Sequence, residues 1–246
     1  MESAESGFVR TETARIHFMT FGNPEATPIV VLHGNGEDIG TLDAQITAFA
    51  ADHWVIAIDS RGHGKSSAGD LPWDFALFAR DVVAVLDETG VRSADYFGYS
   101  DGGNTVLQLI VQHPQRVRCA VVVGANLDPS GLHPWTLATM VVQRAVLGVV
   151  AKRLPCVRRT VARLSLMVDH PQIDPVDLRR RQIPVLVMAG ERDVIRAAHT
   201  GLIATSLPKG RALIMSGAGH DVPMTHAKQC AQASLDFFTT KECYAR

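Results

Sequence analysis

The chain has 246 residues, of which 46% are apolar and 20% charged, and its 24 basic side chains nearly balance 25 acidic ones. This length and composition are typical of one globular domain that carries an insertion, rather than of two equal domains. The formal net charge of -1 lacks the basic excess of a dedicated nucleic-acid-binding protein, so nucleic acid is not expected as a partner.

The first 15 residues contain early acidic side chains and no apolar core, so we expect no secretory signal. The longest apolar runs, such as 28–32 and 119–123, are far shorter than the roughly 18–20 residues of a membrane span. We therefore predict a cytoplasmic protein without a membrane span. The four cysteines are widely separated and form no C-x-x-C motif, which indicates neither a zinc site nor a disulfide scaffold.

Short β-rich runs alternate with longer amphipathic stretches, the pattern of a mostly parallel sheet with helices on both faces. The runs at 7–11 and 14–21 predict an opening hairpin. Later strands are predicted at 28–32, 53–59, 94–99, 117–124, 183–189 and 211–216. Apolar residues at three- and four-residue spacing predict helices at 42–51, 73–89, 104–113, 197–207 and 223–239.

Nearly sixty residues separate the predicted strand that ends at 124 from the one that begins at 183, too many for a single crossover helix. We interpret 127–182 as an inserted helical cap on a core formed by 1–126 and 183–246. Helices are predicted at 135–150 and 157–167, with a short third turn after Asp174-Pro175. The insertion contains nine Lys or Arg residues against four acidic ones.

The predicted strand at 94–99 leads into a helical stretch through Gly98-Tyr99-Ser100-Asp101-Gly102, the pattern G-x-S-x-G. Glycine is needed on both sides because a side chain there would collide with neighbouring backbone at so sharp a turn. The serine would then be an exposed nucleophile at the end of the strand. Taken alone, Ser100 could equally be a helix cap.

A nucleophilic serine needs a histidine to accept its proton and a carboxylate to orient that histidine. Asp193 and His220 each follow a late predicted strand. Because the carboxyl ends of parallel strands line one crevice, we expect Ser100, Asp193 and His220 to meet there. The alternatives are a rival acid, Glu191, and three rival bases, His226, His133 and His170.

The backbone N–H groups of Asn35 and Asp101 are expected to form an oxyanion hole, because Asn35 lies in the loop after an early strand and Asp101 follows the serine. The Asp101 side chain is expected to point away from the site, although it could also place negative charge near it. The ten histidines form no metal-ligand spacing, so no metal site is expected.

Five motifs now occur together in chain order, and in this the chain resembles the α/β-hydrolase fold superfamily over about residues 8–238. The motifs are His33-Gly34-Asn35-Gly36, Asp59-Ser60-Arg61-Gly62-His63-Gly64-Lys65-Ser66, the serine turn, Gly190-Glu191-Arg192-Asp193 and Gly219-His220. The resemblance implies an eight-stranded, mostly parallel sheet flanked by helices, with the insertion as a lid. It also implies a cofactor-free hydrolytic mechanism and a small-molecule substrate bound between core and lid.

Serine at position 100 disfavours the dehalogenases and epoxide hydrolases of this superfamily, whose nucleophile is aspartate. His33-Gly34-Asn35-Gly36 is neither the HGGG of hormone-sensitive-lipase-like esterases nor the HGGPG of proline iminopeptidases. We therefore predict a serine hydrolase that cleaves a small ester, lactone or thioester through an acyl-enzyme on Ser100. The alternatives are a carbon–carbon bond hydrolase of vinylogous diketones and a non-catalytic ligand-binding protein.

Apolar residues of the insertion could line the substrate pocket or only hold the cap helices together. These residues are Trp135, Leu137, Met140, Val141 and Met167. Arg61, His63 and Lys65 are interpreted as part of a structural turn rather than as substrate-binding cations, and the arginines of the insertion as solvated surface charges. The sequence predicts neither the substrate nor the oligomeric state.

Overall fold

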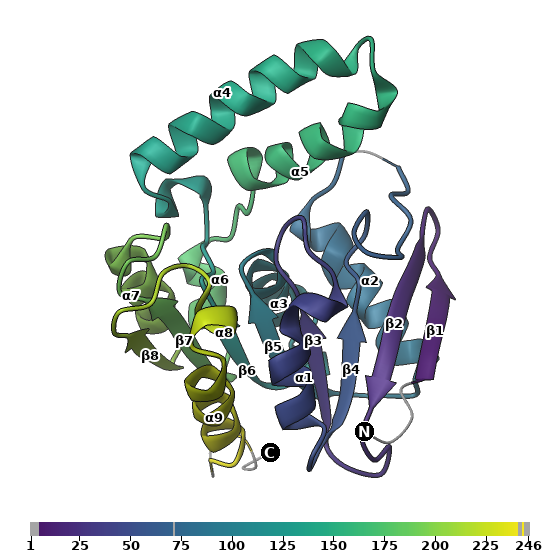
Figure 1. Ribbon diagram of the computed structural model, residues 1–246. Coiled ribbons are helices and arrows are strands. Elements are labelled where there is room, and N and C mark those ends of the chain that lie inside the picture. Colours follow the sequence, from purple (N-terminus) through teal and green to yellow (C-terminus); the bar gives the residue numbers. More distant parts are fainter. Residues whose placement is uncertain (1–4, 71, 241–242, 244–246) are drawn as a thin grey trace.

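Eight strands form one sheet in the computed structural model, which describes residues 5–70, 72–240 and 243 (Figure 1). The strand order is β1-β2-β4-β3-β5-β6-β7-β8, with antiparallel pairing at β1-β2 and β2-β4 and parallel pairing elsewhere. The strands are β1 (Glu5–Arg10), β2 (Arg15–Phe21), β3 (Pro28–Leu32), β4 (Trp54–Ile58), β5 (Ala94–Tyr99), β6 (Val117–Val123), β7 (Pro184–Gly190) and β8 (Lys209–Met215). The expected eight-stranded, mostly parallel sheet is confirmed.

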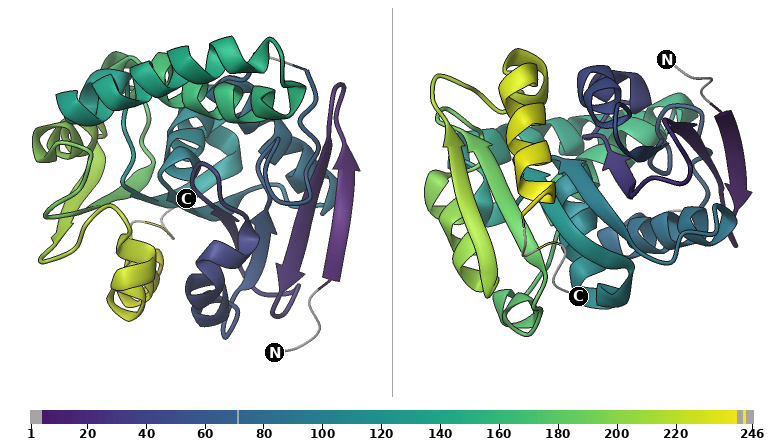
Figure 2. Two further views of the ribbon diagram at one scale, coloured as in Figure 1. Left: turned by 45° about the horizontal axis from the view of Figure 1, so that its top comes forward. Right: turned by 90° about the horizontal axis from the view of Figure 1, so that it is seen from below.

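Helices cover both faces of this sheet, which explains why its central strands are continuous apolar runs (Figure 2). One face packs against α2 (Phe75–Glu88), α3 (Asp101–Gln112), α6 (Pro175–Arg179) and α7 (Ala197–Ser206). The other face packs against α1 (Asp43–Phe49), α8 (Val222–Thr225) and α9 (Ala227–Phe238). Strands β5 and β7 are therefore buried along their whole length.

The segment between β6 and β7 contains two helices that lie above the sheet as a pair, α4 (Pro134–Ala151) and α5 (Arg158–Asp169) (Figures 1 and 2). The pair is joined by Arg144, whose Nη1 lies 2.6 Å from Oδ2 of Asp169. The third helix of the segment, α6, packs on the core instead, because Leu178 is fully buried among the core side chains.

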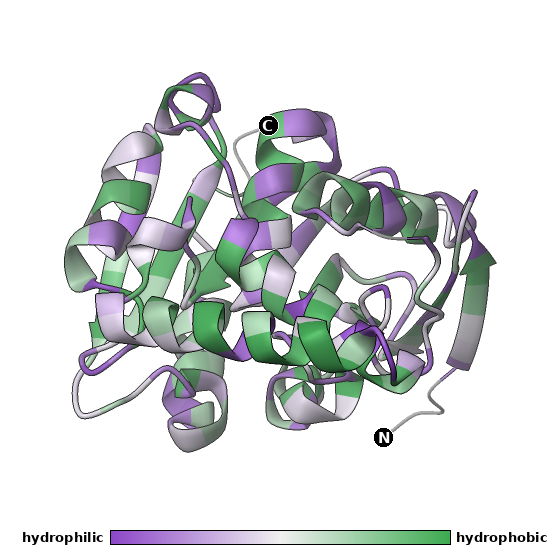
Figure 3. Ribbon diagram, turned by 90° about the horizontal axis from the view of Figure 1, so that it is seen from above, coloured by the Kyte–Doolittle hydropathy of each residue, from purple (hydrophilic) through white to green (hydrophobic). Residues whose placement is uncertain are grey.

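Helix α4 is unusually apolar for a helix that lies on the surface, and Figure 3 shows apolar residues along much of its length. It has 18 residues, a mean hydropathy of 1.3 and only 6% of its length buried. By length and composition alone such a helix could cross a membrane, so the absence of a membrane span stays a prediction. The search for long apolar runs in the sequence did not identify this helix as a possible membrane span, because Thr, Gln and Arg interrupt its apolar residues.

Most predicted helices end within two residues of the observed ones, and two differ by more than that. The stretch predicted as one helix at 223–239 consists of α8 and α9, which are separated at His226. Helix α3 begins at Asp101, three residues before its predicted start, because Gly102 and Gly103 belong to the helix rather than to a turn. The first turn of α3 therefore follows Ser100 directly.

Candidate active site

Ser100 stands at the sharp turn between β5 and α3. Its φ of 52° is the only positive φ of a non-glycine residue in the described part of the chain. The flanking glycines make the turn feasible: a Cβ on Gly98 would lie 2.5 Å from the carbonyl oxygen of Gly102, and one on Gly102 would lie 2.2 Å from that of Leu32. The backbone alone therefore sets the position of the Ser100 hydroxyl.

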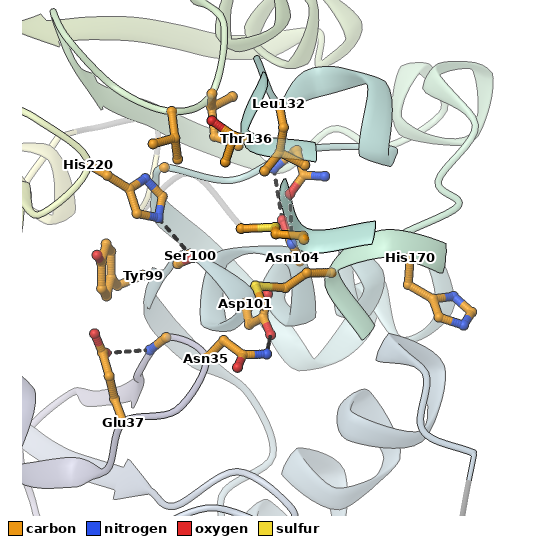
Figure 4. Close-up of a pocket in the computed structure, with 17 residues that line it drawn as sticks. Asn35, Glu37, Tyr99, Ser100, Asp101, Asn104, Leu132, Thr136, His170 and His220 are labelled. Carbon is orange, nitrogen blue, oxygen red and sulfur yellow. Dashed lines mark hydrogen bonds between the residues drawn. The ribbon is translucent and has the colours of Figure 1, made fainter. Parts of the chain in front are cut away.

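The Ser100 hydroxyl belongs to a continuous chain of hydrogen bonds. Its Oγ lies 3.0 Å from Nε2 of His220 (Figure 4). Nδ1 of that imidazole lies 2.7 Å from Oδ1 of Asp193. An ionised carboxylate only accepts hydrogen bonds, so Nδ1 donates to Asp193 and Nε2 accepts from the hydroxyl of Ser100. The structure thus brings together the three side chains that the sequence indicated, from the loops after β5, β7 and β8.

The rival acid and bases lie in other environments. Glu191 accepts hydrogen bonds from the N–H of Gly217 (2.8 Å) and the hydroxyl of Ser216 (3.2 Å), and these bonds lower the pKa of Glu191. His226 is bonded to the hydroxyl of its neighbour Thr225. Of the rival bases only His170 lines the cavity beside Ser100. None of these side chains takes the place of Asp193 or His220.

A cavity of about 310 Å³ lies at Ser100, between the sheet and the α4–α5 pair. Met140 and Met167 line it, as expected. The other three predicted pocket residues, Trp135, Leu137 and Val141, are not among its lining residues. This corrects the expectation for them, because Trp135 is 87% exposed and the face of α4 that meets the cavity carries Thr136 and Met140, one helical turn apart.

Several polar residues that sequence reasoning missed also line the cavity. Asn104 and Asn126 bond each other, through Nδ2 of Asn104 to Oδ1 of Asn126 (2.9 Å) and from the N–H of Asn126 to Asn104 (2.8 Å). Glu37 accepts a hydrogen bond from the N–H of Gly34 at 2.9 Å. The only signal for Glu37 was its place in the loop after the strand at 28–32, which also carries Asn35.

Asn35 and Asp101 both line the cavity next to Ser100. Within the described chain, the backbone N–H groups of these two residues donate no hydrogen bond to another protein group. An N–H at the start of a helix has no intrahelical acceptor, so that of Asp101 at the start of α3 is free for a ligand. Two unengaged donors beside the hydroxyl could stabilise negative charge on a carbonyl oxygen.

The Asp101 carboxyl is turned towards Asn35 and accepts a hydrogen bond from its Nδ2 at 2.7 Å, and both residues are among those that line the cavity (Figure 4). Burial raises the pKa of Asp101 to about 6, although the Asn35 bond opposes this shift. Burial also raises the pKa of Glu37. The second of the two alternatives for Asp101, a carboxyl group near the site, therefore describes the structure.

Residues 27–155 match the family described as alpha/beta hydrolase fold. Over 248 residues the chain is 29% identical to the dihydrolipoyllysine-residue acetyltransferase component of an acetoin cleaving system from Pseudomonas putida; the match covers 90% of this chain and 66% of that protein, just under two thirds of its length. It is also 26% identical over 213 residues to 3-oxoadipate enol-lactonase 2 from Acinetobacter baylyi, with 76% of this chain and 79% of that protein covered.

The fold is similar to the crystal structure of a hydrolase from Pseudomonas aeruginosa PA01. The TM-score is 0.82 at 25% sequence identity, and the alignment covers 96% of this chain and 98% of that one. The similarity in structure therefore extends over nearly the whole length of both chains.

Proposed function

We propose that this chain, which belongs to the alpha/beta hydrolase fold family, is a serine hydrolase that cleaves a small carboxylic ester, lactone or thioester through an acyl-enzyme on Ser100. The observation that carries the proposal is the hydrogen-bonded chain from Ser100 through His220 to Asp193 at a cavity of substrate size. The similarity to an enol-lactonase supports a carbonyl substrate of this kind.

In the proposed mechanism, Nε2 of His220 accepts the Ser100 proton while Oγ attacks the substrate carbonyl carbon. Asp193 stabilises the imidazolium that forms. The N–H groups of Asn35 and Asp101 donate to the carbonyl oxygen as it becomes negative. His220 then protonates the leaving alcohol or thiol, and a water molecule, deprotonated by the same imidazole, hydrolyses the acyl-enzyme.

We propose that 127–182 acts as a lid over this reaction. Its inner surface supplies Met140 and Met167 to the cavity. Helix α5 is tied to the core beside the site, because the carbonyl oxygen of Arg163 accepts from Nδ2 of Asn35 (3.2 Å) and its guanidinium donates to the carbonyl oxygen of Gly62 (2.9 Å). A lid held in this way would exclude bulk water from the acyl-enzyme.

The test is the hydrolysis of short-chain p-nitrophenyl esters, lactones and thioesters by the wild-type chain and by Ser100→Ala. We expect Ser100→Ala to lose turnover by about 10⁴-fold or more, and a fluorophosphonate probe to label the wild type but not this variant. The matched control is Ser130→Ala, which removes an exposed serine hydroxyl outside the cavity. Absence of labelling in a folded wild-type protein would overturn the proposal, whereas turnover of a vinylogous diketone alone would favour carbon–carbon cleavage.

A further inference from the structure

The cavity at Ser100 has an acidic lining. Asp101 and Glu37, two acidic residues, are both among the residues that line it. Among the described residues that line the cavity there is no Lys or Arg, and only His170 and His220 can become cationic. In the proposed mechanism His220 must be neutral when substrate binds, so it does not balance the two carboxyl groups in the active form of the protein.

Asp101 is the more confined of the two acids. Its residue is only 7% exposed, and its Oδ2 accepts the hydrogen bond from Asn35. Within the described chain no hydrogen bond reaches its other carboxylate oxygen, Oδ1. Oδ1 is not among the buried side-chain oxygens that lack a hydrogen-bond partner, so it retains accessible surface, and a cation or donor bound beside Asp101 can reach it.

The basic residues of the insertion do not balance this charge. Arg144 is paired with Asp169 on the α4–α5 pair, away from the cavity lining. Arg163 lies beside the site, because its backbone carbonyl contacts Asn35, but its guanidinium donates to the carbonyl oxygen of Gly62. The positive charge of the insertion therefore gives no support to capture of an anionic substrate.

We propose that Asp101, assisted by Glu37, forms a subsite for a cationic group of the substrate, such as an ammonium, and disfavours substrates that carry a carboxylate. This inference rests on the proposed function, since it assigns a substrate class to the same site. An ammonium would give Oδ1 of Asp101 a charge-assisted hydrogen bond or ion pair. A carboxylate would instead meet two like charges in a site of low effective dielectric constant.

The experiment compares esters that are matched in shape and differ in charge. The acyl series consists of p-nitrophenyl esters whose far end carries a trimethylammonium, a tert-butyl or a carboxylate group. The alcohol series compares acetylthiocholine with its neutral isostere, 3,3-dimethylbutyl thioacetate. We expect kcat/KM in at least one series to favour the cationic over the neutral ester, and the neutral over the anionic ester, by about tenfold or more at each step.

Isosteric variants identify the groups responsible. Asp101→Asn keeps an acceptor for Asn35, and Glu37→Gln keeps one for the N–H of Gly34. We expect Asp101→Asn to reduce the cation-to-neutral ratio by about tenfold, and Glu37→Gln to reduce it less because Glu37 is less buried. Asp38→Asn is the matched control: it removes an exposed charge from the same loop, outside the cavity, and should leave the ratio unchanged.

A pH series on the wild type gives a readout that needs no variant. Because the pKa of Asp101 is raised to about 6, this carboxyl is ionised at pH 8 and largely protonated at pH 5, so the cation-to-neutral ratio should fall as the pH falls. Protonation of His220 affects both esters alike and cancels in the ratio. The groups that act on Asp101 are Asn35, His220 and Glu37. His170 lines the same cavity, and His170→Gln should leave the pH trend in place.

The outcomes separate the inference from the function beneath it. A ratio of kcat/KM for the cationic ester to kcat/KM for the neutral ester that falls in Asp101→Asn, and also falls at low pH, supports the subsite. Hydrolysis that depends on Ser100 but shows no preference for the cation in either series, or an equal preference in Asp101→Asn, overturns the subsite while the proposed function stands. Loss of all hydrolysis in the wild type overturns the proposed function itself.

Discussion

Oδ1 of Asp193 accepts two hydrogen bonds, one from Nδ1 of His220 at 2.7 Å and one from the N–H of Ile195 at 2.9 Å. The second bond fixes the carboxylate, so that the imidazole is held with Nε2 towards Ser100. Asp193→Asn should therefore disturb the tautomer of His220 while the loop after β7 keeps its shape. We expect kcat for a p-nitrophenyl ester to fall about 10³–10⁴-fold, with little change in Tm.

Glu191→Gln is the control for this prediction. Glu191 belongs to the same loop, but its carboxylate contacts Gly217 and Ser216 rather than His220. The variant should retain kcat within a few-fold of the wild type. A loss as large as that of Asp193→Asn would show that Glu191, not Asp193, orients the histidine.

The raised pKa of Asp101 also predicts how stability varies with pH. Since the folded-state pKa of about 6 exceeds the ordinary value of 3.8, the folded protein favours the protonated carboxyl. The resulting destabilisation is absent below about pH 4, grows as the pH rises from about 4 to 6, and is complete above about pH 6. Asp101→Asn should therefore raise the free energy of unfolding by about 1–3 kcal/mol at pH 8 and by much less at pH 4. Urea unfolding at the two pH values measures this, and an equal effect at both would contradict it.

Arg61 is a structural residue rather than part of the cavity lining. It is 1% exposed, and its Nε and Nη2 donate to the two carboxylate oxygens of Asp81 at 2.8 and 2.6 Å. Arg61→Met leaves a buried carboxylate without its partner, so it should lower the free energy of unfolding by about 3–5 kcal/mol. KM for a neutral ester should not change in the protein that remains folded.

The double variant Arg61→Met with Asp81→Leu tests the cause of that loss. Because it removes both charges, it should recover a large part of the stability lost in Arg61→Met. Thermal unfolding of the two variants measures the difference. A double variant less stable than the single one would mean that Arg61 acts through its bonds to Thr11 and Thr13 rather than through Asp81.

Two glycines on helices should respond to alanine in opposite ways. In Gly102→Ala the new Cβ would lie 2.2 Å from the carbonyl oxygen of Leu32, so the turn at Ser100 must shift. We expect the free energy of unfolding to fall by about 1–3 kcal/mol. Ester turnover should also fall, because Ser100 is displaced. In Gly148→Ala the Cβ meets nothing within 4 Å, and the better helix propensity of alanine should stabilise α4 by about 0.5–1 kcal/mol. The free energy of unfolding and the rate of ester turnover, measured for both variants and the wild type, test this contrast.

The hydrogen-bonded residues of the site could be predicted because each lies in the turn or loop that follows a strand. Strands were recognisable as buried apolar runs, and parallel strands deliver the residues at their carboxyl ends to one edge. Glycines marked the turn at Ser100, where only a missing side chain allows the approach of α3 to β3. These features depend on short stretches of chain, and for that reason one sequence was sufficient to identify them.

The cavity lining could not be predicted in the same way. Helix α4 is apolar on nearly all sides, so its sequence does not indicate which face meets the core, and Trp135 turned out to face solvent. Asn104 on α3 meets Asn126 from the segment after β6, and Glu37 lines the same cavity, only once the chain has folded. The direction of the Asp101 side chain depends likewise on its contact with Asn35 from another loop.

The positive φ of Ser100 has an evolutionary consequence. This φ results from the close contact of Gly98, Gly102 and Leu32, not from any property of the hydroxyl. The location of the reacting atom and its chemical identity can thus change independently of each other. Replacement of this one residue would place a different nucleophile in front of the same imidazole. Descendants of this chain can therefore acquire a new reaction while the fold around the site stays the same.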